Sequence, residues 1–420
     1  MPPIRYDPMA PGDWDDPYPT YRRLRNEAPV HYAPGSKTYT VSRYDDVLEL
    51  LKSPGLFSSA SAFDLLLQGL LSAPGWRDLV AFARFLTKAR AGWGMLLKGP
   101  SESMIGMDPP RHDALRSIVN RAFTPRRIDS WRARVGELVD GCMAKLRRGE
   151  PFDVVADLAV PVPMTVIAEM IGVAPERRQD FKEWSDKIIA GVSSKDRKRA
   201  RPAMLDAFTE LSGYVDGVVA ARRRHPEDDL VSLLVDPAQG ETLSPEAILQ
   251  FVLLLLVAGN ETTTNLIGNA IVSLLRNPDQ LELVAADPEL VPNLVEETLR
   301  YDTPVQFIAR RASQDVEVAG ARIPADSRVV VLLGSANRDE RQFEDPDDFD
   351  LSRDTKGHVG FGHGVHFCLG ASLARMEAHA ALEALVPELP RLRAPIGDMP
   401  MIDSILVRGR QRIRVGPAAR

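Results

Sequence analysis

The stretch Phe361-Gly-His-Gly-Val-His-Phe-Cys368-Leu-Gly370 frames one cysteine with three glycines and two histidines. The glycines are expected to leave room for a flat, bulky group to approach the backbone. Helical periodicity follows from Leu369 to Val386, and Pro387 ends it. Cys368 is therefore expected at a helix N-terminus, where the helix dipole and free N–H groups favour a thiolate. The alternative is a buried structural cysteine, which the surrounding glycines and histidines disfavour.

This stretch resembles the haem-binding loop of cytochrome P450 enzymes. The family pattern has a phenylalanine, a glycine three positions on, a histidine or arginine two before the cysteine, and a glycine two after it. The chain matches this pattern at Phe361, Gly364, His366, Cys368 and Gly370. The resemblance implies that the Cys368 sulfur is the proximal ligand of the iron in haem b, and that Phe361 belongs to the haem site.

Composition is that of a globular protein. The chain has 420 residues, 44% of them hydrophobic, so it can bury a large core. A net charge of -6 argues against nucleic-acid binding. Two cysteines, no signal peptide and no apolar run of roughly 18–20 residues favour a cytoplasmic protein without a transmembrane segment. With no repeat or linker, we expect a single domain spanning residues 1–420.

Strand signals are few and short. Alternating residues at 30–32 and 38–41, around Pro34-Gly35, predict a hairpin, and a second strand-rich stretch runs from Val316 to Leu333. Most of the remainder is helical in pattern. We therefore expect a mainly α protein with minor β (α+β), with small β-sheets near the N-terminus and in the C-terminal half.

One helix is predicted to be very long. It begins after Ser244, with Pro245 at the first helical position, and continues to Arg276, before Asn277-Pro278. About 32 residues give a length of roughly 48 Å. Residues 251–258 are apolar on every face, which is typical of a helix that crosses the middle of a globule.

The centre of this helix is interrupted by Gly259-Asn260-Glu261-Thr262-Thr263-Thr264, which is costly in a helix and suggests a function. With Ala258, this stretch resembles the oxygen-activation motif of cytochrome P450 enzymes. The resemblance implies that Ala258 lets the helix pass close over a haem face, and that Thr262 and Glu261 are catalytic residues that deliver protons. Thr262 is expected to bond back to the Ala258 carbonyl and loosen the helix. The alternative is a polar kink without catalytic role.

Glu297 and Arg300 lie three positions apart on one predicted helix, which by itself is typical of a weak surface ion pair. In the family that the chain resembles, this pair is buried and bonds to a later arginine, holding the haem loop. Arg353 matches that arginine. The resemblance therefore implies a structural role for all three residues.

Haem carries two propionates, and buried carboxylates need cationic donors. The resemblance implies that His112, Arg116, Arg310 and His366 hold them. His112 and Arg116 are four positions apart, so they point the same way from a helix. In isolation such a pair would more often lie on a solvated helix face.

Similar proteins line the substrate pocket with three segments. The residues implied here are Leu254, Leu255, Val305, Ile308, Ile405 and Leu406. An apolar lining favours a lipophilic substrate held mainly by shape. Gln306 is a polar candidate, with bonding to backbone as the alternative. The apolar stretch 60–99 is expected to form a lid, or alternatively a helix that docks on a membrane or partner.

The implied activity is that of a monooxygenase, which inserts one atom of O2 into a lipophilic small molecule. Hydroxylation of a terpenoid, steroid, fatty acyl or macrolide-type compound is expected. No flavin or nicotinamide fingerprint occurs, so electrons are expected from a separate ferredoxin and an NAD(P)H-driven ferredoxin reductase. A candidate ferredoxin patch comprises Arg111, Arg121, Arg126 and Arg127.

Two rival functions remain at this stage. One is a haem-thiolate ligand or gas sensor without turnover, against which the Glu261-Thr262 pair argues. The other is a hydrolase with Cys368 as nucleophile, for which His363 and His366 are too close in sequence.

Overall fold

The computed structural model describes residues 4–9, 15–60, 103–193, 197–237, 242–404 and 407–417. The chain forms two compact units that alternate along the sequence. The first unit comprises Met1–Phe57, Pro125–Pro163 and Glu261–Arg420, and the second comprises Ser58–Thr124 and Met164–Asn260. The expectation of one domain over the whole chain stays a prediction. The apolar stretch 60–99, expected to form a lid or a docking helix, lies outside the described residues from position 61 on.

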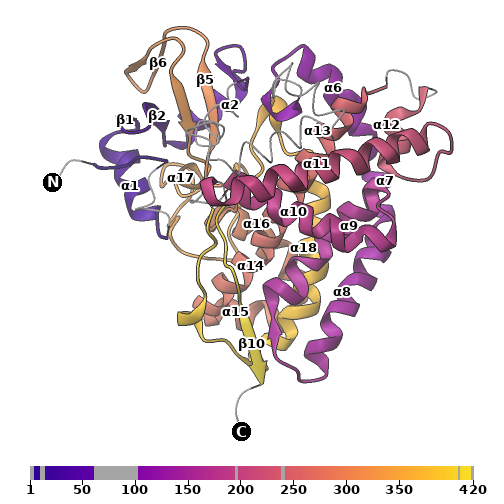
Figure 1. Ribbon diagram of the computed structural model, residues 1–420. Helices are drawn as coiled ribbons and strands as arrows, with labels where there is room; N and C mark the ends of the chain where they lie inside the picture. Colours follow the sequence, from indigo (N-terminus) through magenta and orange to yellow (C-terminus); the bar gives the residue numbers. More distant parts are fainter. Residues whose placement is uncertain are drawn as a thin grey trace. The chain divides into compact units, whose positions relative to one another are not determined.

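A five-stranded sheet belongs to the first unit, apart from the end of its last strand (Figure 1). Its order is β1 (Val30–Ala33), β2 (Thr38–Val41), β8 (Arg328–Val331), β5 (Ile308–Ala312) and β3 (Phe57–Ser58). The predicted hairpin is confirmed, since β1 and β2 pair in antiparallel register. However, β2 also pairs with β8 in parallel, which joins the N-terminal hairpin to the C-terminal half. The apolar run at 329–331 is fully buried, as expected for a central strand.

Two smaller sheets complete the β-structure of the described residues. One pairs β6 (Val316–Val318) with β7 (Ala321–Ile323). The other has the order β4 (Phe152–Asp153), β10 (Arg414–Pro417) and β9 (Leu392–Arg393). The predicted class, mainly α with minor β, is confirmed.

The first unit contains nine complete α-helices in its described residues. They are α1 (Tyr18–Glu27), α2 (Tyr44–Lys52), α7 (Pro125–Ser130), α8 (Arg132–Arg147), α14 (Glu261–Arg276), α15 (Pro278–Ala286), α16 (Val291–Tyr301), α17 (Leu333–Ala336) and α18 (Ala371–Leu385). Helix α18 packs against α8, α14 and α16. Leu373 and Met376 of the expected periodicity are buried, whereas Ala380 and Ala384, which were expected on the same face, are half-buried.

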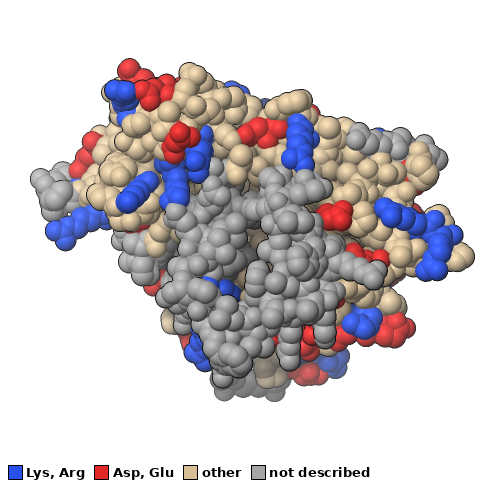
Figure 2. Space-filling model, turned by 45° about the horizontal axis from the view of Figure 1, so that its top comes forward, with Lys and Arg blue, Asp and Glu red and all other residues tan. Residues whose placement is uncertain are grey.

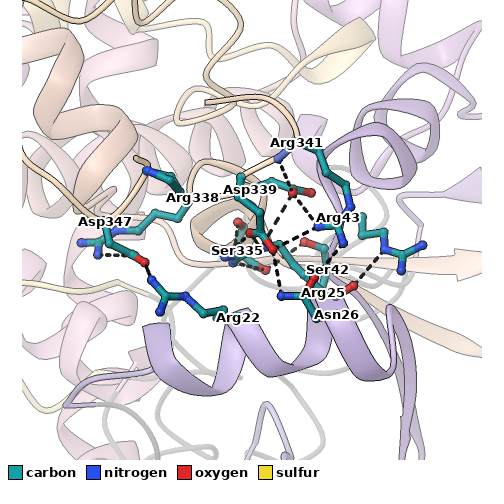
Figure 3. Close-up of polar contacts among 12 residues, drawn as sticks. Arg22, Arg25, Asn26, Ser42, Arg43, Ser335, Arg338, Asp339, Arg341 and Asp347 are labelled. Atoms are coloured by element: carbon teal, nitrogen blue, oxygen red, sulfur yellow. Dashed lines mark hydrogen bonds and ion pairs between the residues drawn. The ribbon is translucent and has the colours of Figure 1, made fainter. Parts of the chain in front are cut away.

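Helix α1 is anchored to the segment after β8 through buried charge (Figure 3). The Arg25 guanidinium is almost fully buried and donates to the Ser335 carbonyl oxygen at 3.2 Å. Arg341 reaches back and donates to the Asn26 side-chain oxygen at 2.7 Å. A buried guanidinium needs such acceptors, so these bonds fix the N-terminal helix on the first unit.

The second unit is mainly helical in its described residues. It contains α6 (Arg111–Asn120), α10 (Arg178–Ser193), α11 (Arg197–Arg222), α12 (Leu230–Val235), α13 (Pro245–Leu255) and most of α9 (Pro161–Ile171). Helices α10 and α11 pack along one another. The rings of Trp184 and Tyr214 meet there at 5.7 Å.

The predicted long helix is confirmed as a continuous run from Pro245 to Arg276. The Ser244 hydroxyl caps it by accepting from the Ala247 N–H at 3.1 Å. The run is not a uniform α-helix, because residues 256–260 form a π-helical turn between α13 and α14. Such bulges are frequent at functional sites. This one overlaps the predicted interruption only at Gly259 and Asn260, because residues 261–264 are regular α-helix in α14.

Within the described residues, two helical stretches are long and apolar enough to cross a membrane. They are Val154–Ile171 and Pro245–Arg276, with 67% and 50% of their most apolar windows buried. Helices in the core of a globular protein pass the same test, so this is weak evidence for a membrane span. On the face drawn in Figure 2, basic and acidic side chains of the described residues lie interspersed.

Candidate active site

The cysteine loop, residues 361–370, lies in the first unit and leads directly into α18. The Cys368 backbone N–H donates to the Phe361 carbonyl oxygen at 3.0 Å, which closes the loop on itself. Gly362 and Gly364 both have φ of +71°, a region that other residues rarely adopt. The backbone of the loop is therefore specified by its glycines.

The three glycines differ in the space they leave. A side chain at Gly364 would place its first carbon 2.4 Å from the Leu51 carbonyl oxygen, so this glycine is needed for packing against α2. At Gly370 no atom lies within 4 Å of that position. The expectation that the glycines leave room for a flat group is wrong for Gly364, where the Leu51 backbone takes that space, and stays a prediction for Gly362 and Gly370.

Cys368 is half-buried, and the two cysteines of the chain form no disulfide with each other. It lies just before α18, which begins at Ala371, as the sequence predicts. The Arg375 guanidinium interacts electrostatically with the sulfur, and such a neighbour favours a thiolate. A partly open sulfur beside a cation suits a ligand of haem iron, and the half-buried Phe361 ring belongs to the same loop.

The acid–threonine pair lies at the junction of the π-helical turn and α14. Burial raises the pKa of Glu261 to about 7. Thr262 is half-buried, and Ala258, one turn earlier, is exposed. Residues four positions apart lie on the same face of a helix, so Ala258 and Thr262 share a face that is not fully buried. A carboxyl group with a pKa near neutrality can both hold and release a proton.

A second buried acid, Glu377 on α18, was missed by sequence reasoning. Its side chain is 2% exposed, and the Thr263 hydroxyl bonds to its carboxyl group. Burial raises its pKa to about 8, although the bond from Thr263 opposes the shift. The available signal was an acid on the apolar stripe of α18, four positions after Leu373.

The raised pKa of Glu377 predicts a stability that falls as pH rises. Between its ordinary value of 4.5 and about 8, the folded chain retains a proton that the unfolded chain has lost. Replacing Glu377 with glutamine should remove this penalty. The free energy of unfolding, measured with urea, should fall between about pH 5 and pH 8 in the unmodified protein. In Glu377→Gln this fall should be smaller by up to about 4 kcal/mol.

The matched control is the exposed Glu383 on the same helix, whose change to glutamine should leave the pH dependence unaltered. Equal slopes for Glu377→Gln and the unmodified protein would contradict the assignment.

Glu297 and Arg300 form a buried pair, not a surface one. Both side chains are 0% exposed, and two Arg300 nitrogens donate to the two Glu297 oxygens at 2.7 Å. Arg353 approaches Glu297 at 3.4 Å, and its side chain is 10% exposed. Arg300 also donates to the carbonyl oxygens of Asn337 and Pro346. The geometry of this triad agrees with the sequence prediction, and its action on the haem loop stays a prediction.

The residues predicted to hold the propionates are divided between the two units. His112 is buried on α6 and bonds through Nδ1 to the Asp113 carboxylate at 2.8 Å, and Arg116 is half-buried on the same helix. Arg310 is buried on β5, and His366 is half-buried in the cysteine loop. That these four hold one haem stays a prediction. The arginines of the candidate ferredoxin patch also fall in both units.

The predicted pocket segments are partly brought together. Val305 pairs with Val407 in an antiparallel β-bridge, so the segment after α16 lies beside the segment between Met401 and Arg410, two residues that also pair in a β-bridge. Val305 and Ile308 are half-buried, as are Leu254 and Leu255 in the second unit. Ile405 and Leu406 lie outside the described residues. Gln306 donates to the Thr303 carbonyl oxygen at 2.7 Å, which favours the alternative that it bonds backbone.

Comparisons with known proteins agree with this geometry. The family model for cytochrome P450 matches residues 95–415. Vitamin D(3) 25-hydroxylase from Pseudonocardia autotrophica is 38% identical over 409 residues, covering 96% of this chain and 94% of the relative.

Solved structures agree as well. Cytochrome P450 CYP109Q5 from Chondromyces apiculatus has a TM-score of 0.84 at 37% identity, covering 99% of each chain. CYP109E1 from Bacillus megaterium, in complex with testosterone, has a TM-score of 0.80 at 33% identity, covering 96% of this chain and 100% of that one. Because these matches extend over nearly the whole length of chain and relatives, the protein belongs to the cytochrome P450 family of haem-thiolate monooxygenases, with the family's fold and with haem b as its cofactor.

Proposed function

We propose that this monooxygenase hydroxylates a lipophilic small molecule of the terpenoid, steroid, fatty acyl or macrolide type. Electrons would come in the cytoplasm from a separate ferredoxin and its reductase. The observation that carries the proposal is the half-exposed Cys368 thiol beside Arg375, in a loop closed by the bond to Phe361. When bound there, haem supplies the redox chemistry that activates O2.

The chain's own residues have three tasks in this proposal. Cys368 would hold the cofactor by its sulfur, and His112, Arg116, Arg310 and His366 would donate hydrogen bonds to its propionates. Hydroxylation places one oxygen atom in the product and the other in water, which consumes two electrons and two protons. Glu261, with its near-neutral pKa, would pass protons inward, and the Thr262 hydroxyl would direct them to the reacting oxygen.

The substrate class rests on the apolar residues predicted to line the pocket and on relatives. One relative is named as a vitamin D(3) hydroxylase, and one structural neighbour holds testosterone. Both compounds are large, apolar and polycyclic. Because the residues predicted to line the pocket are apolar, such a molecule would be selected by its shape and by burial of its apolar surface.

The test is reconstitution of the haem-loaded protein with a ferredoxin, its reductase and NAD(P)H. Hydrophobic compounds would first be screened for a shift of the haem Soret band and then incubated for turnover. A product heavier by one oxygen atom, labelled when 18O2 is supplied, is the expected result. Soret shifts without product from any compound that binds would favour a ligand sensor instead.

Replacing Thr262 with alanine should uncouple electron consumption from product formation. Without the hydroxyl, protons reach the reacting oxygen less selectively, so NAD(P)H oxidation should continue while product per NAD(P)H falls at least about tenfold. Peroxide release should rise, and haem content should not change. The measurement is the ratio of product to NAD(P)H consumed.

Thr264→Ala is the matched control for this prediction, because the Thr264 hydroxyl donates to the Ala159 carbonyl oxygen at 2.9 Å within the first unit. Its loss should cost about 1 kcal/mol of stability but leave coupling intact. Thr262→Ser, which keeps a hydroxyl, should recover most of the coupling. Full coupling in Thr262→Ala would refute the proton-delivery role.

A further inference from the structure

A charged cluster that the mechanism above does not use lies beside the cysteine loop. It comprises Glu296 on α16, His358 before the loop, and Arg375 on α18. Arg375 donates two hydrogen bonds to the Glu296 carboxylate, at 2.6 and 2.8 Å. His358 Nε2 lies 3.0 Å from the same carboxylate. The side chains of Glu296 and Arg375 are 26% and 32% exposed, and that of His358 is 7% exposed.

The protonation pattern of the cluster follows from its hydrogen bonds. His358 Nδ1 accepts from the Gly360 N–H at 3.1 Å, so its hydrogen is carried by Nε2 and is donated to Glu296. Burial alone would raise the pKa of Glu296, but the bonds from Arg375 and His358 outweigh it and lower the pKa to about 2. Glu296 is therefore a carboxylate with two firm donors.

Arg375 also faces the cysteine loop. Its guanidinium lies over the Phe361 ring, 4.5 Å from the ring centre. The bond to Glu296 raises the pKa of Arg375, and the nearby Cys368 acts in the same direction. The guanidinium is thus held by a carboxylate on one side and by an aromatic ring on another. It is a permanent positive charge held against Phe361, whose carbonyl oxygen accepts from the Cys368 N–H in the same loop.

We propose that Glu296, His358 and Arg375 are positioning residues for Cys368, which hold one fixed positive charge beside its sulfur and so set the reduction potential of the iron that this sulfur ligates. The inference rests on the proposed role of Cys368 as that ligand. Reduction adds one negative charge to the iron–sulfur centre, and a nearby cation favours the more negative state. Glu296 matters because its two hydrogen bonds prevent the guanidinium from turning away.

Arginine is required here for its shape as well as its charge. A planar guanidinium can bond a carboxylate at two points while it stacks on a ring, and an ammonium group cannot do both. Lysine at position 375 should keep the charge but lose its fixed position. The two properties can therefore be separated by substitution.

The experiment compares Arg375→Gln, Arg375→Lys and Glu296→Gln as haem-loaded proteins. The first readout is the reduction potential from a dye-mediated redox titration. The second is the rate at which the ferrous carbon-monoxide spectrum changes from the thiolate-type Soret band to the shorter-wavelength band of a protonated or lost thiolate. Neither readout depends on substrate or turnover.

Arg375→Gln should shift the potential to more negative values and speed the spectral change at least about tenfold, as expected for loss of an outer-sphere partner. Arg375→Lys and Glu296→Gln should give shifts of the same sign but smaller size. The control is Arg322→Gln on β7, where the arginine side chain is 76% exposed. It removes the same charge from the protein surface and should change neither readout.

The outcomes separate the inference from the function on which it rests. A thiolate-type spectrum in the unmodified protein, with unchanged potential and spectral stability in the variants, would overturn the inference and leave the proposed function intact. If Arg375→Gln fails to bind haem, unchanged potentials in both Arg375→Lys and Glu296→Gln would likewise overturn it. Absence of a thiolate-type spectrum from the unmodified protein would refute the proposed function itself.

Discussion

Replacing Cys368 with serine should abolish the thiolate-type ferrous carbon-monoxide spectrum and reduce product formation to below about 1% of the unmodified protein. The expectation follows from the position of the sulfur, half-exposed in a glycine-specified loop beside Arg375. A serine hydroxyl is not ionised near neutral pH and is a poor ligand for haem iron. Mutation of a residue that only bonds to a metal ligand already lowers metal affinity or activity by about 10- to 100-fold. Loss of the ligand itself should lower activity further.

The chain provides a matched control in its other cysteine. Cys142 on α8 is also half-exposed, but burial and the nearby Asp157 raise the pKa of its thiol. Cys142→Ser should retain the spectrum and the activity. A thiolate-type spectrum that persisted in Cys368→Ser and vanished in Cys142→Ser would reverse the assignment.

Removing the guanidinium of Arg300 should destabilise the protein by about 3–5 kcal/mol. Arg300→Ala would leave the Glu297 carboxylate buried without its principal partner, and breaking a buried pair in this way costs far more than the pair contributes when intact. It would also remove donors to the carbonyl oxygens of Asn337, Pro346 and Asp348. Urea unfolding followed by circular dichroism gives the change, and haem content should fall with it.

Arg132→Ala is the control, because Asp129 and Arg132 have the same spacing of three residues and a bond of 3.0 Å, but both side chains are 69% exposed. This substitution should cost less than about 1 kcal/mol. Where Arg300→Ala does not yield folded protein, Glu297→Gln provides the measurement. If Arg300→Ala or Glu297→Gln lowers the free energy of unfolding no more than Arg132→Ala does, burial does not make this ion pair more important for stability.

Much of the architecture could be predicted because its signals are local. Ser244 and Pro245 mark the start of the long helix, and Leu373 and Met376, three positions apart, mark the buried face of α18. The β1–β2 hairpin follows from its own alternation and turn. Each of these features depends on residues within about one or two turns of each other, where propensity and capping act.

The parallel pairing of β2 with β8 had no such signal. Almost three hundred positions separate these strands, and the alternation within a strand does not specify its partner. For the same reason the glycines of the cysteine loop looked alike in sequence. Only the approach of Leu51 distinguishes Gly364, which is needed for packing, from Gly370, which faces open space.

The amino-acid sequence by itself determined the cysteine loop, the interrupted long helix and the candidates Glu261, Thr262 and Cys368, because these depend on residue type and short spacing. Only the tertiary structure decided which charges are buried and what they face. Glu377 acquires its raised pKa from burial against α14, and Arg375 meets Glu296 from 79 positions away. Burial and electrostatic fields are sums over neighbours in space, and most of those neighbours are distant along the chain.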